Sequence, residues 1–271
     1  MLKKVMGKSF TFAISLMTIL FTFVPESMFE KCVLFETQYR EVNIIINRII
    51  CLITLFVFIC ICYYLYMRLR DKVTIKGKNY IIQIEYGDIF GLNNCKRVIP
   101  FDECFTTIVG AAPSEIKANS ICGQYLNSNP IDNMAELIQN AQLRCKQKPS
   151  RFKNSICYRS GTLLARGNDL LMAFAYLDED GVARMTRDEY LDSLSVLWRE
   201  IEKYYGQSDV CIPILGSGLT RINGYDITQQ ELLDIIIMSY KLSSYKIKSP
   251  YKLRIICKRN DDFSLNEINE R

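Results

Sequence analysis

The chain of 271 residues has a formal net charge of +5 and contains eleven cysteines but no histidine. Without imidazole, Ser-His and Cys-His nucleophiles and histidine-ligated metals are excluded. The first 72 residues hold nine Lys/Arg against five Asp/Glu, whereas the remainder holds 25 against 24. A nearly neutral segment of about 200 residues can bury one core and has no electrostatic signature of nucleic-acid binding. We therefore expect no metal, no cofactor, no catalytic residue and no nucleic-acid partner.

Two N-terminal stretches, Ser9–Val24 and Ile49–Met67, contain no charged residue. As a helix, the second rises about 28 Å, close to the thickness of the hydrocarbon layer. The first is shorter and becomes long enough if Val5–Lys8 join it. These stretches predict a transmembrane hairpin over residues 1–72, with helices at about 5–24 and 44–67, followed by a domain over residues 73–271. A cleaved signal peptide is the alternative for the first stretch.

The distribution of positive charge predicts the orientation of this hairpin. Cations lie before the first stretch and after the second, whereas the connecting segment carries two cations against four glutamates. The flanking cations are Lys3, Lys4, Lys8, Arg68, Arg70, Lys72, Lys76 and Lys78. By the positive-inside rule, both termini face the cytoplasm and the chain is a multi-pass protein of the inner membrane. Scattered cysteines without C-x-x-C spacing fit the reducing cytosol.

Strand-like and helix-like patterns alternate from residue 80 onward. Helices are predicted at 131–143 and after two capping boxes that begin at Thr186 and Thr228. The predicted strands are 80–86, 170–177, 210–215 and 251–257. The predicted core face of the helix after Thr186 is Leu191, Leu194, Trp198, Ile201 and Tyr205. This rhythm predicts a predominantly parallel sheet with helices on its faces, and residues 260–271 are expected to fray.

The apolar run Val210–Leu215 ends in Gly216-Ser217-Gly218-Leu219-Thr220-Arg221. Glycines there let a ligand approach the backbone closely. Successive backbone N–H groups at the carboxyl end of a strand form a concavity that suits phosphate. An ordinary strand-to-helix turn is the alternative for a bare G-S-G sequence.

Three segments together resemble the macro domain, the ADP-ribose-binding fold. They are Gly87-Asp88-Ile89-Phe90 after the first soluble strand, Gly161-Thr162, and Gly216–Leu219. In that family, the aspartate of a G-D-I segment accepts a hydrogen bond from the adenine amine and a G-[ST]-G-[ILV] loop wraps the diphosphate. Asp88, Ile89 and Gly216–Leu219 match those positions.

More narrowly, the chain resembles the macro-like effectors of the type II Thoeris antiphage system. The matching stretches are Phe101–Phe105, Gly123-Gln124-Tyr125-Leu126 and Pro213–Arg221. This resemblance implies an α/β, macro-like mixed sheet with helices on both faces, preceded by a two-helix transmembrane hairpin. It also implies an effector that binds an ADP-ribose-derived nucleotide made by a TIR-domain enzyme, oligomerises and disrupts the lipid bilayer, which causes abortive infection.

One departure concerns catalysis. Ordinary macro domains carry a V-N-A-A-N segment where this chain has Val98-Ile99-Pro100-Phe101-Asp102-Glu103. Asp102 can hold a ribose hydroxyl or cap a helix, and both remain open. A membrane-tethered ADP-ribosyl hydrolase with Asp102 or Glu103 as general base, or a passive ADP-ribose reader, is the alternative function. The expected ligand-binding residues are Asp88, Ile89, Asp102, Gly123, Gln124, Gly216, Ser217, Gly218, Leu219, Thr220 and Arg221.

Self-association is the last expectation from the sequence. Hydroxyl residues recur along the first helix at intervals of three or four, at Thr11, Ser15, Thr18 and Thr22. This spacing suits association between membrane helices, although packing alone would explain it.

Overall fold

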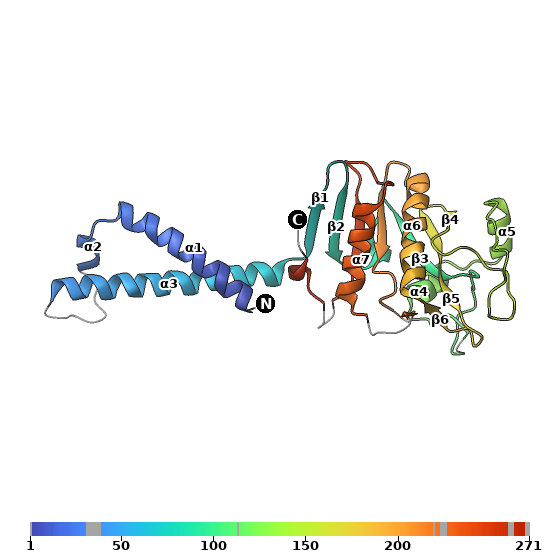
Figure 1. The fold of residues 1–271 in the computed structure, drawn as a ribbon, viewed down its shortest axis with the longest axis horizontal. Helices are drawn as coiled ribbons and strands as arrows, with labels where there is room; N and C mark the ends of the chain where they lie inside the picture. Colours follow the sequence, from blue (N-terminus) through green and yellow to red (C-terminus); the bar gives the residue numbers. More distant parts are fainter. Residues whose placement is uncertain are drawn as a thin grey trace. The chain divides into compact units, whose positions relative to one another are not determined.

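The computed structural model describes residues 2–30, 39–112, 114–218, 220–222, 227–259 and 263–268. The chain divides into two compact units, Met1–Arg70 and Asp71–Arg271, each with its own internal contacts (Figure 1). In its described part, the first unit is helical. The second unit is built around one mixed sheet.

Two long helices, α1 (Leu2–Phe23) and α3 (Arg40–Leu69), make up most of the first unit, and α2 (Ser27–Glu30) lies between them in the chain. The rings of Phe10 on α1 and Phe56 on α3 meet edge to face, with 6.0 Å between centroids. Towards the other end of α1, the Arg48 guanidinium of α3 lies over the ring of Phe21 at 5.0 Å. The two helices therefore pack antiparallel.

Among the described residues, only the helix Glu41–Leu69 is long and apolar enough to cross a membrane, by length and composition alone. The apolar part of α1, Ser9–Phe23, is shorter. The structure thus supports one of the two predicted spans, and the crossing of α1 stays a prediction.

The hydroxyl residues of α1 lie on its exposed surface. Each hydroxyl donates to the carbonyl oxygen four residues earlier, at 2.9 to 3.2 Å. These residues are Thr11, Ser15, Thr18 and Thr22. Packing against α3 therefore does not account for their spacing.

The second unit contains a sheet with the strand order β1-β2-β9-β7-β3-β5-β6-β8, and β4 pairs with β5. The strands β2, β9, β7, β3 and β5 are mutually parallel, whereas β1, β4 and β6 pair antiparallel. The bounds are β1 Lys72–Lys76, β2 Ile81–Tyr86, β3 Cys95–Asp102, β4 Leu163–Arg166, β5 Asp169–Leu177, β6 Ala183–Met185, β7 Asp209–Pro213, β8 Arg221–Ile222 and β9 Leu253–Cys257. This confirms the mixed, predominantly parallel sheet.

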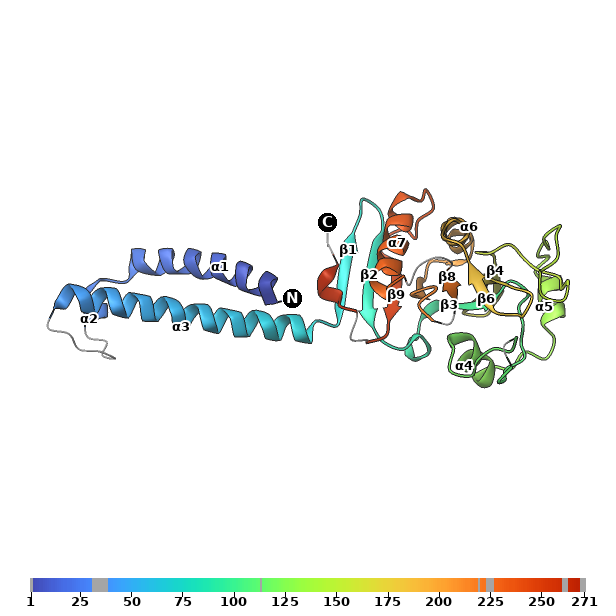
Figure 2. The same ribbon diagram turned by 60° about the horizontal axis from the view of Figure 1, so that its bottom comes forward.

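Helices cover both faces of this sheet, as predicted. Figure 2 shows α6 (Arg187–Tyr204) and α7 (Gln229–Leu242) on one side and α4 (Ile121–Ser128) on the other. The short helix α5 (Met134–Asn140) packs on the same core cluster as α4. Two 3₁₀ turns complete the unit, η1 (Ile89–Gly91) and η2 (Leu265–Glu267). Both predicted capping boxes are present at the starts of α6 and α7.

Several local predictions were wrong. The helix predicted at 131–143 is shortened to α5, and the predicted core residue Leu191 is 44% exposed, because α6 buries the face that carries Tyr190 instead. Residues 263–268 do not fray. Phe263, Leu265 and Ile268 are buried, and the ring of Phe263 packs on that of Tyr86 at 5.8 Å.

The chain enters the sheet beside the end of β2. Because β1 is antiparallel to β2, Lys72 faces Glu85, and the carbonyl oxygen of Asp71 accepts the N–H of Tyr86 at 3.0 Å. The Asp71 carboxylate also pairs with Arg259, which follows β9, at 2.5 Å.

Candidate functional site

The carboxyl ends of the parallel strands lie along one edge of the sheet, where ligands usually bind in α/β folds. The register pairs Tyr86 with Cys257, Ile256 with Pro213, and Arg97 with Cys211. Asp88 follows β2, Gly216 follows β7 and Asp102 ends β3, so all three lie at this edge. The β3–β7 pairing stops at Arg97, and the register of β3 against β5 shifts between Phe101 and Asp102. Three strand spacings, roughly 14 Å, separate β2 from β3. We call this row of strand ends the carboxyl edge.

Asp88 and Ile89 form the turn after β2. Asp88 is exposed, and its Oδ1 accepts the N–H of Phe90 at 3.1 Å, which caps η1. Ile89 is 4% exposed and packs against Cys211 and Ile256 below the edge. The side chain of Ile89 therefore anchors the turn, whereas the carboxylate of Asp88 faces solvent.

The glycine loop after β7 is held from below. Gly216 has a φ of +82°, in the left-handed region that favours glycine. The Ser217 hydroxyl donates to the carbonyl oxygen of Ile214 at 2.7 Å. The buried hydroxyl of Tyr190, on α6, donates to the carbonyl oxygen of Leu215 at 2.9 Å, and burial raises the pKa of this phenol. These contacts fix the first half of the loop without using Gly218.

The second half of the loop leads across the carboxyl edge. A Cβ atom at Gly218 would meet no heavy atom of the described residues within 4 Å, so its surroundings are open on their side. Leu219 lies outside the described residues, and Thr220 is partly buried. Arg221 begins β8 and faces Arg184 of β6. The chain therefore passes from β7 to the far side of β5 within a few residues.

Asp102, at the end of β3, caps the turn that follows it. Its Oδ1 accepts the N–H groups of Cys104 at 2.8 Å and Thr106 at 3.2 Å. Burial raises the pKa of the Asp102 carboxyl, and the hydrogen bonds from Thr106 and Cys104 act in the opposite direction. Three residues after Asp102, Phe105 has a φ of +54°, which is uncommon for a residue with a bulky side chain. No described helix begins at Asp102, so its carboxylate caps a turn rather than a helix, and the contact with a ribose hydroxyl stays a prediction.

Glu103 lies on the inner side of the same turn and is 3% exposed. Its carboxylate accepts hydrogen bonds from Lys146 Nζ at 2.9 Å, the Ser150 hydroxyl at 2.7 Å and the N–H of Leu177 at 3.2 Å. The Lys146 ammonium also lies 4.0 Å from the centroid of the Tyr176 ring. Glu103 is thus a fully partnered structural carboxylate.

Gly123 and Gln124 lie on α4, beside the carboxyl edge rather than on it. A Cβ atom at Gly123 would lie 2.2 Å from the carbonyl oxygen of Lys117, so glycine is required for close packing. The Gln124 side-chain amide donates to the carbonyl oxygen of Asn119 at 2.8 Å. Ile121, at the start of α4, packs on the cluster that contains Ile89. Both predicted residues therefore stabilise the neighbouring helix in this structure.

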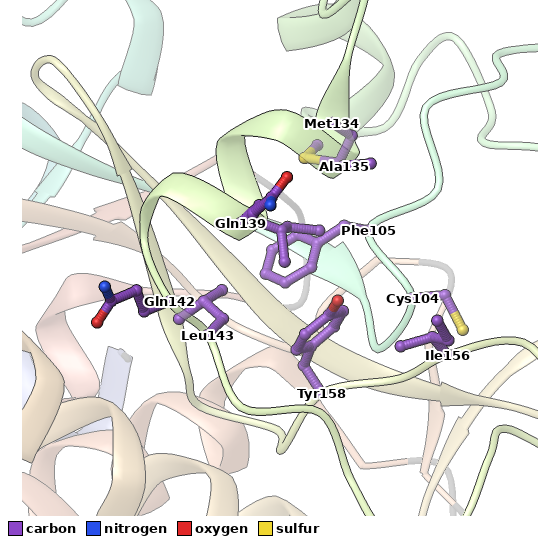
Figure 3. Close-up of a pocket in the computed structure, with 10 residues that line it drawn as sticks. Cys104, Phe105, Met134, Ala135, Gln139, Gln142, Leu143, Ile156 and Tyr158 are labelled. Atoms are coloured by element: carbon purple, nitrogen blue, oxygen red, sulfur yellow. The ribbon is translucent and has the colours of Figure 1, made fainter.

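Two cavities begin where the Asp102 turn ends. The first, about 620 Å³, is an apolar groove between α5 and the rings of Phe105 and Tyr158 (Figure 3). The second, about 450 Å³, is polar and includes Glu103, Lys146 and Arg184. Asp88 and Gly216 line neither cavity.

The sequence did not predict the residues that hydrogen-bond to the candidate site. Tyr190 precedes Leu191, which the helical periodicity placed in the core, and no sequence pattern predicts the hydrogen bond from Tyr190 to the carbonyl oxygen of Leu215. Lys146 and Ser150 lie in a segment without regular periodicity, so only the fold brings them to Glu103. A buried carboxylate requires partners, but the burial of Glu103 is itself visible only in the structure.

Comparisons with known proteins agree with the resemblance seen in the sequence. Residues 82–258 match a family model described as "Thoeris protein ThsA, Macro domain". The chain is 28% identical over 225 residues to the "Thoeris protein ThsA" of Bacillus amyloliquefaciens, covering 79% of this chain and 75% of that protein.

Solved macrodomains are more distant. A variant of the Oceanobacillus iheyensis macrodomain with ADPR is 11% identical, with a TM-score of 0.47, and the match covers 70% of this chain and 92% of that one. The Thermus aquaticus DarG macrodomain is 12% identical, with a TM-score of 0.38, and covers 65% and 97%. The family model, in contrast, spans well over half of the chain, from β2 to the end of β9. The chain therefore belongs to the family of Thoeris ThsA macro domains.

Proposed function

We propose that this protein is a membrane effector of Thoeris antiphage defence whose macro domain binds an ADP-ribose-derived signalling nucleotide. The observation that carries the proposal is that Asp88, the glycine loop and Asp102 lie at the carboxyl ends of the parallel strands β2, β7 and β3. Asp88 accepts the adenine amine, the backbone N–H groups around Gly218 receive the diphosphate, and the distal ribose lies towards Asp102. A TIR-domain enzyme supplies the nucleotide.

The contacts of the two neighbouring carboxylates favour a receptor over a hydrolase. A general base needs an oxygen within reach of the proton that it removes. Asp102 already accepts two backbone N–H groups, and Glu103 accepts three donors while buried. ADP-ribosylated protein incubated with the purified chain should therefore remain unhydrolysed, and release of ADP-ribose that Glu103→Gln abolishes would establish the enzyme instead.

The membrane part acts by assembly. A ligand that binds better to an assembly-competent state shifts the population towards oligomers. The hydroxyls of α1 are exposed on the surface that does not pack on α3, where a neighbouring copy can meet them. Clustered helices then disrupt the inner membrane and cause abortive infection.

Membrane potential in cells that make the activating nucleotide tests this division of labour. Full-length protein should depolarise the cells, whereas Gly218→Val and a form lacking residues 1–70 should not. Ser244→Val, at an exposed position after α7, is the matched control and should behave as wild type. Depolarisation by the form lacking residues 1–70, or at full strength by Gly218→Val, would contradict the proposal.

The orientation is tested separately. A reporter fused after Arg271 should show cytoplasmic activity, because the flanking cations lie on one side of the predicted spans. Periplasmic activity at that position would place the domain away from a cytosolic nucleotide and would reject the receptor.

A further inference from the structure

Two buried cysteines meet on neighbouring strands of the sheet, away from the carboxyl edge. Cys95 begins β3, and Cys211 lies in the middle of β7. Both are free thiols, and the Cys211 thiol donates a hydrogen bond to the sulfur of Cys95, with 2.8 Å between the two Sγ atoms. Cys95 is 4% exposed and Cys211 is fully buried. The fold therefore brings together two thiols that are 116 residues apart in the chain, which we call the thiol pair.

The register of the sheet places the thiol pair between two arginines. In the parallel pairing, Cys211 lies opposite Arg97 of β3 on one side and opposite Arg254 of β9 on the other. Cys95 is two residues before Arg97, so its side chain projects from the same face of the sheet. Each arginine also pairs with a carboxylate on the strand beyond it, and both arginine side chains are partly exposed. The thiol pair therefore lies beside two guanidinium groups that border solvent.

These neighbours activate Cys95 as a nucleophile. The hydrogen bond from Cys211 lowers the pKa of the Cys95 thiol, and the positive charges of Arg254 and Arg97 act in the same direction, against the effect of burial. The same hydrogen bond, together with burial, raises the pKa of Cys211, so the shared proton stays on Cys211. Cys95 is thus the thiolate of the pair, and the thiolate is the form of cysteine that peroxides oxidise.

Four other cysteines of the second unit have the opposite property. Burial raises the pKa of Cys104 and of Cys257 to about 12, and that of Cys157 to about 11. Burial also raises the pKa of Cys122. A small oxidant should therefore react with the thiol pair before it reacts with these four thiols.

We propose that Cys95 and Cys211 form a redox-modification site whose substrate is a small hydroperoxide. The Cys95 thiolate attacks one oxygen of the peroxide, which breaks the O–O bond, forms a sulfenic acid and releases hydroxide. The sulfur of Cys211 then attacks the sulfur of Cys95, and the sulfenic oxygen leaves as water with the Cys211 proton. The two cysteines lose two electrons and become a disulfide, and hydrogen peroxide gains these electrons as it becomes water and hydroxide.

The disulfide would lie in the packed layer below the Asp88 turn. The cluster that contains the thiol pair also contains Ile256 and Ile89, and Ile89 anchors that turn. A thiolate from a cytosolic reductant reverses the bond by exchange, as is usual for redox-sensing disulfides in that compartment. The reaction requires no nucleotide, so the inference does not depend on the proposed function.

Peptide mapping by mass spectrometry tests the site on the full-length protein in detergent micelles. Reduced protein is treated with limiting hydrogen peroxide, the peroxide is removed, and the remaining thiols are alkylated as the protein is unfolded. The peptides that contain Cys95 and Cys211 should be joined by a disulfide while Cys104, Cys122 and Cys257 are still alkylated. A thiol reductant added before unfolding should restore both thiols.

Two single variants separate the two chemical steps. In Cys211→Ala, oxidation of Cys95 should stop at the sulfenic acid, which dimedone added during unfolding labels. In Cys95→Ala, Cys211 should remain a thiol under the same treatment. Cys257→Ala, which removes a buried thiol from the neighbouring strand β9, is the matched control and should still form the disulfide between Cys95 and Cys211.

The wild-type mapping decides the proposal even where a variant fails to fold. A thiol pair that is still reduced after the other thiols of the second unit are oxidised would overturn the inference. A disulfide that joins Cys95 or Cys211 to any other cysteine would overturn it as well. Dimedone labelling of Cys211 in Cys95→Ala, as fast as that of Cys95 in Cys211→Ala, would reject Cys95 as the nucleophile.

Discussion

Replacement of Gly218 by valine separates ligand approach from folding. The new side chain would enter open space, since a Cβ there meets no heavy atom within 4 Å in the part of the chain that the structure describes. The free energy of unfolding should therefore change by less than about 1 kcal/mol. For a domain of this size, the melting temperature should move by no more than about 2–4 °C.

Gly216→Ala gives the opposite pattern. Gly216 has a φ of +82°, and its Cβ would lie 3.2 Å from Cδ1 of Ile222. An alanine in the left-handed region costs roughly 1–2 kcal/mol. The melting temperature should fall by about 2–8 °C, because the backbone of the loop is strained in the folded state.

Thermal unfolding and calorimetric titration with ADP-ribose measure the two effects on the same preparations. Gly218→Val should keep the wild-type melting temperature and lose affinity by about tenfold or more, since a backbone-bound diphosphate is displaced. Gly216→Ala should unfold at lower temperature. Wild-type affinity in a stable Gly218→Val protein would show that the ligand does not rest on this loop.

Three further changes test the surroundings of the site. Tyr190→Phe leaves the carbonyl oxygen of Leu215 without its buried donor, and denaturant unfolding should show a loss of about 1–3 kcal/mol; an unchanged midpoint would show that this bond contributes nothing. Because burial raises the pKa of Asp102, the stability from its protonated form is complete below its ordinary pKa of 3.8 and is lost as pH rises through the raised value. Asp102→Asn keeps the acceptor of the turn and should therefore unfold at higher denaturant than wild type at pH 7, with the gap narrowing towards pH 4; a gap that is constant with pH would refute this reasoning. Leu265→Ala should cost about 2–5 kcal/mol, since Leu265 is 1% exposed, whereas no change would indicate a frayed terminus.

Sequence patterns were sufficient to predict an element when the residues that define its ends or its buried face lie within the element itself. The capping boxes at Thr186 and Thr228 announced the starts of α6 and α7, because each box satisfies its own backbone N–H groups. The apolar run before Gly216 likewise identified β7 and the loop after it. These elements needed no knowledge of their neighbours.

The strand β3 was not predicted, since Lys96, Arg97 and Pro100 interrupt its apolar pattern. In the fold, β3 lies between β7 and β5, and the Arg97 guanidinium pairs with Asp169 of β5 at 2.7 Å. Such a strand is stabilised by partners from distant sequence, so its own composition is a poor guide. For the same reason, the sequence did not predict that Lys146, Ser150 and the N–H of Leu177 donate to Glu103.

The direction of the first strand determines where the domain is joined to the chain before it. Because β1 runs antiparallel to β2, Asp71, the residue before β1, lies beside the end of β2. Asp71 contacts the backbone of Tyr86, which ends β2, and the side chain of Arg259, which follows β9. The Asp71–Arg259 pair is exposed, and pairs of this kind contribute only about 0–1 kcal/mol. The start of the domain and the Asp88 turn therefore lie one strand spacing apart, and a backbone hydrogen bond and one exposed ion pair are the contacts named here between Asp71 and the ends of β2 and β9.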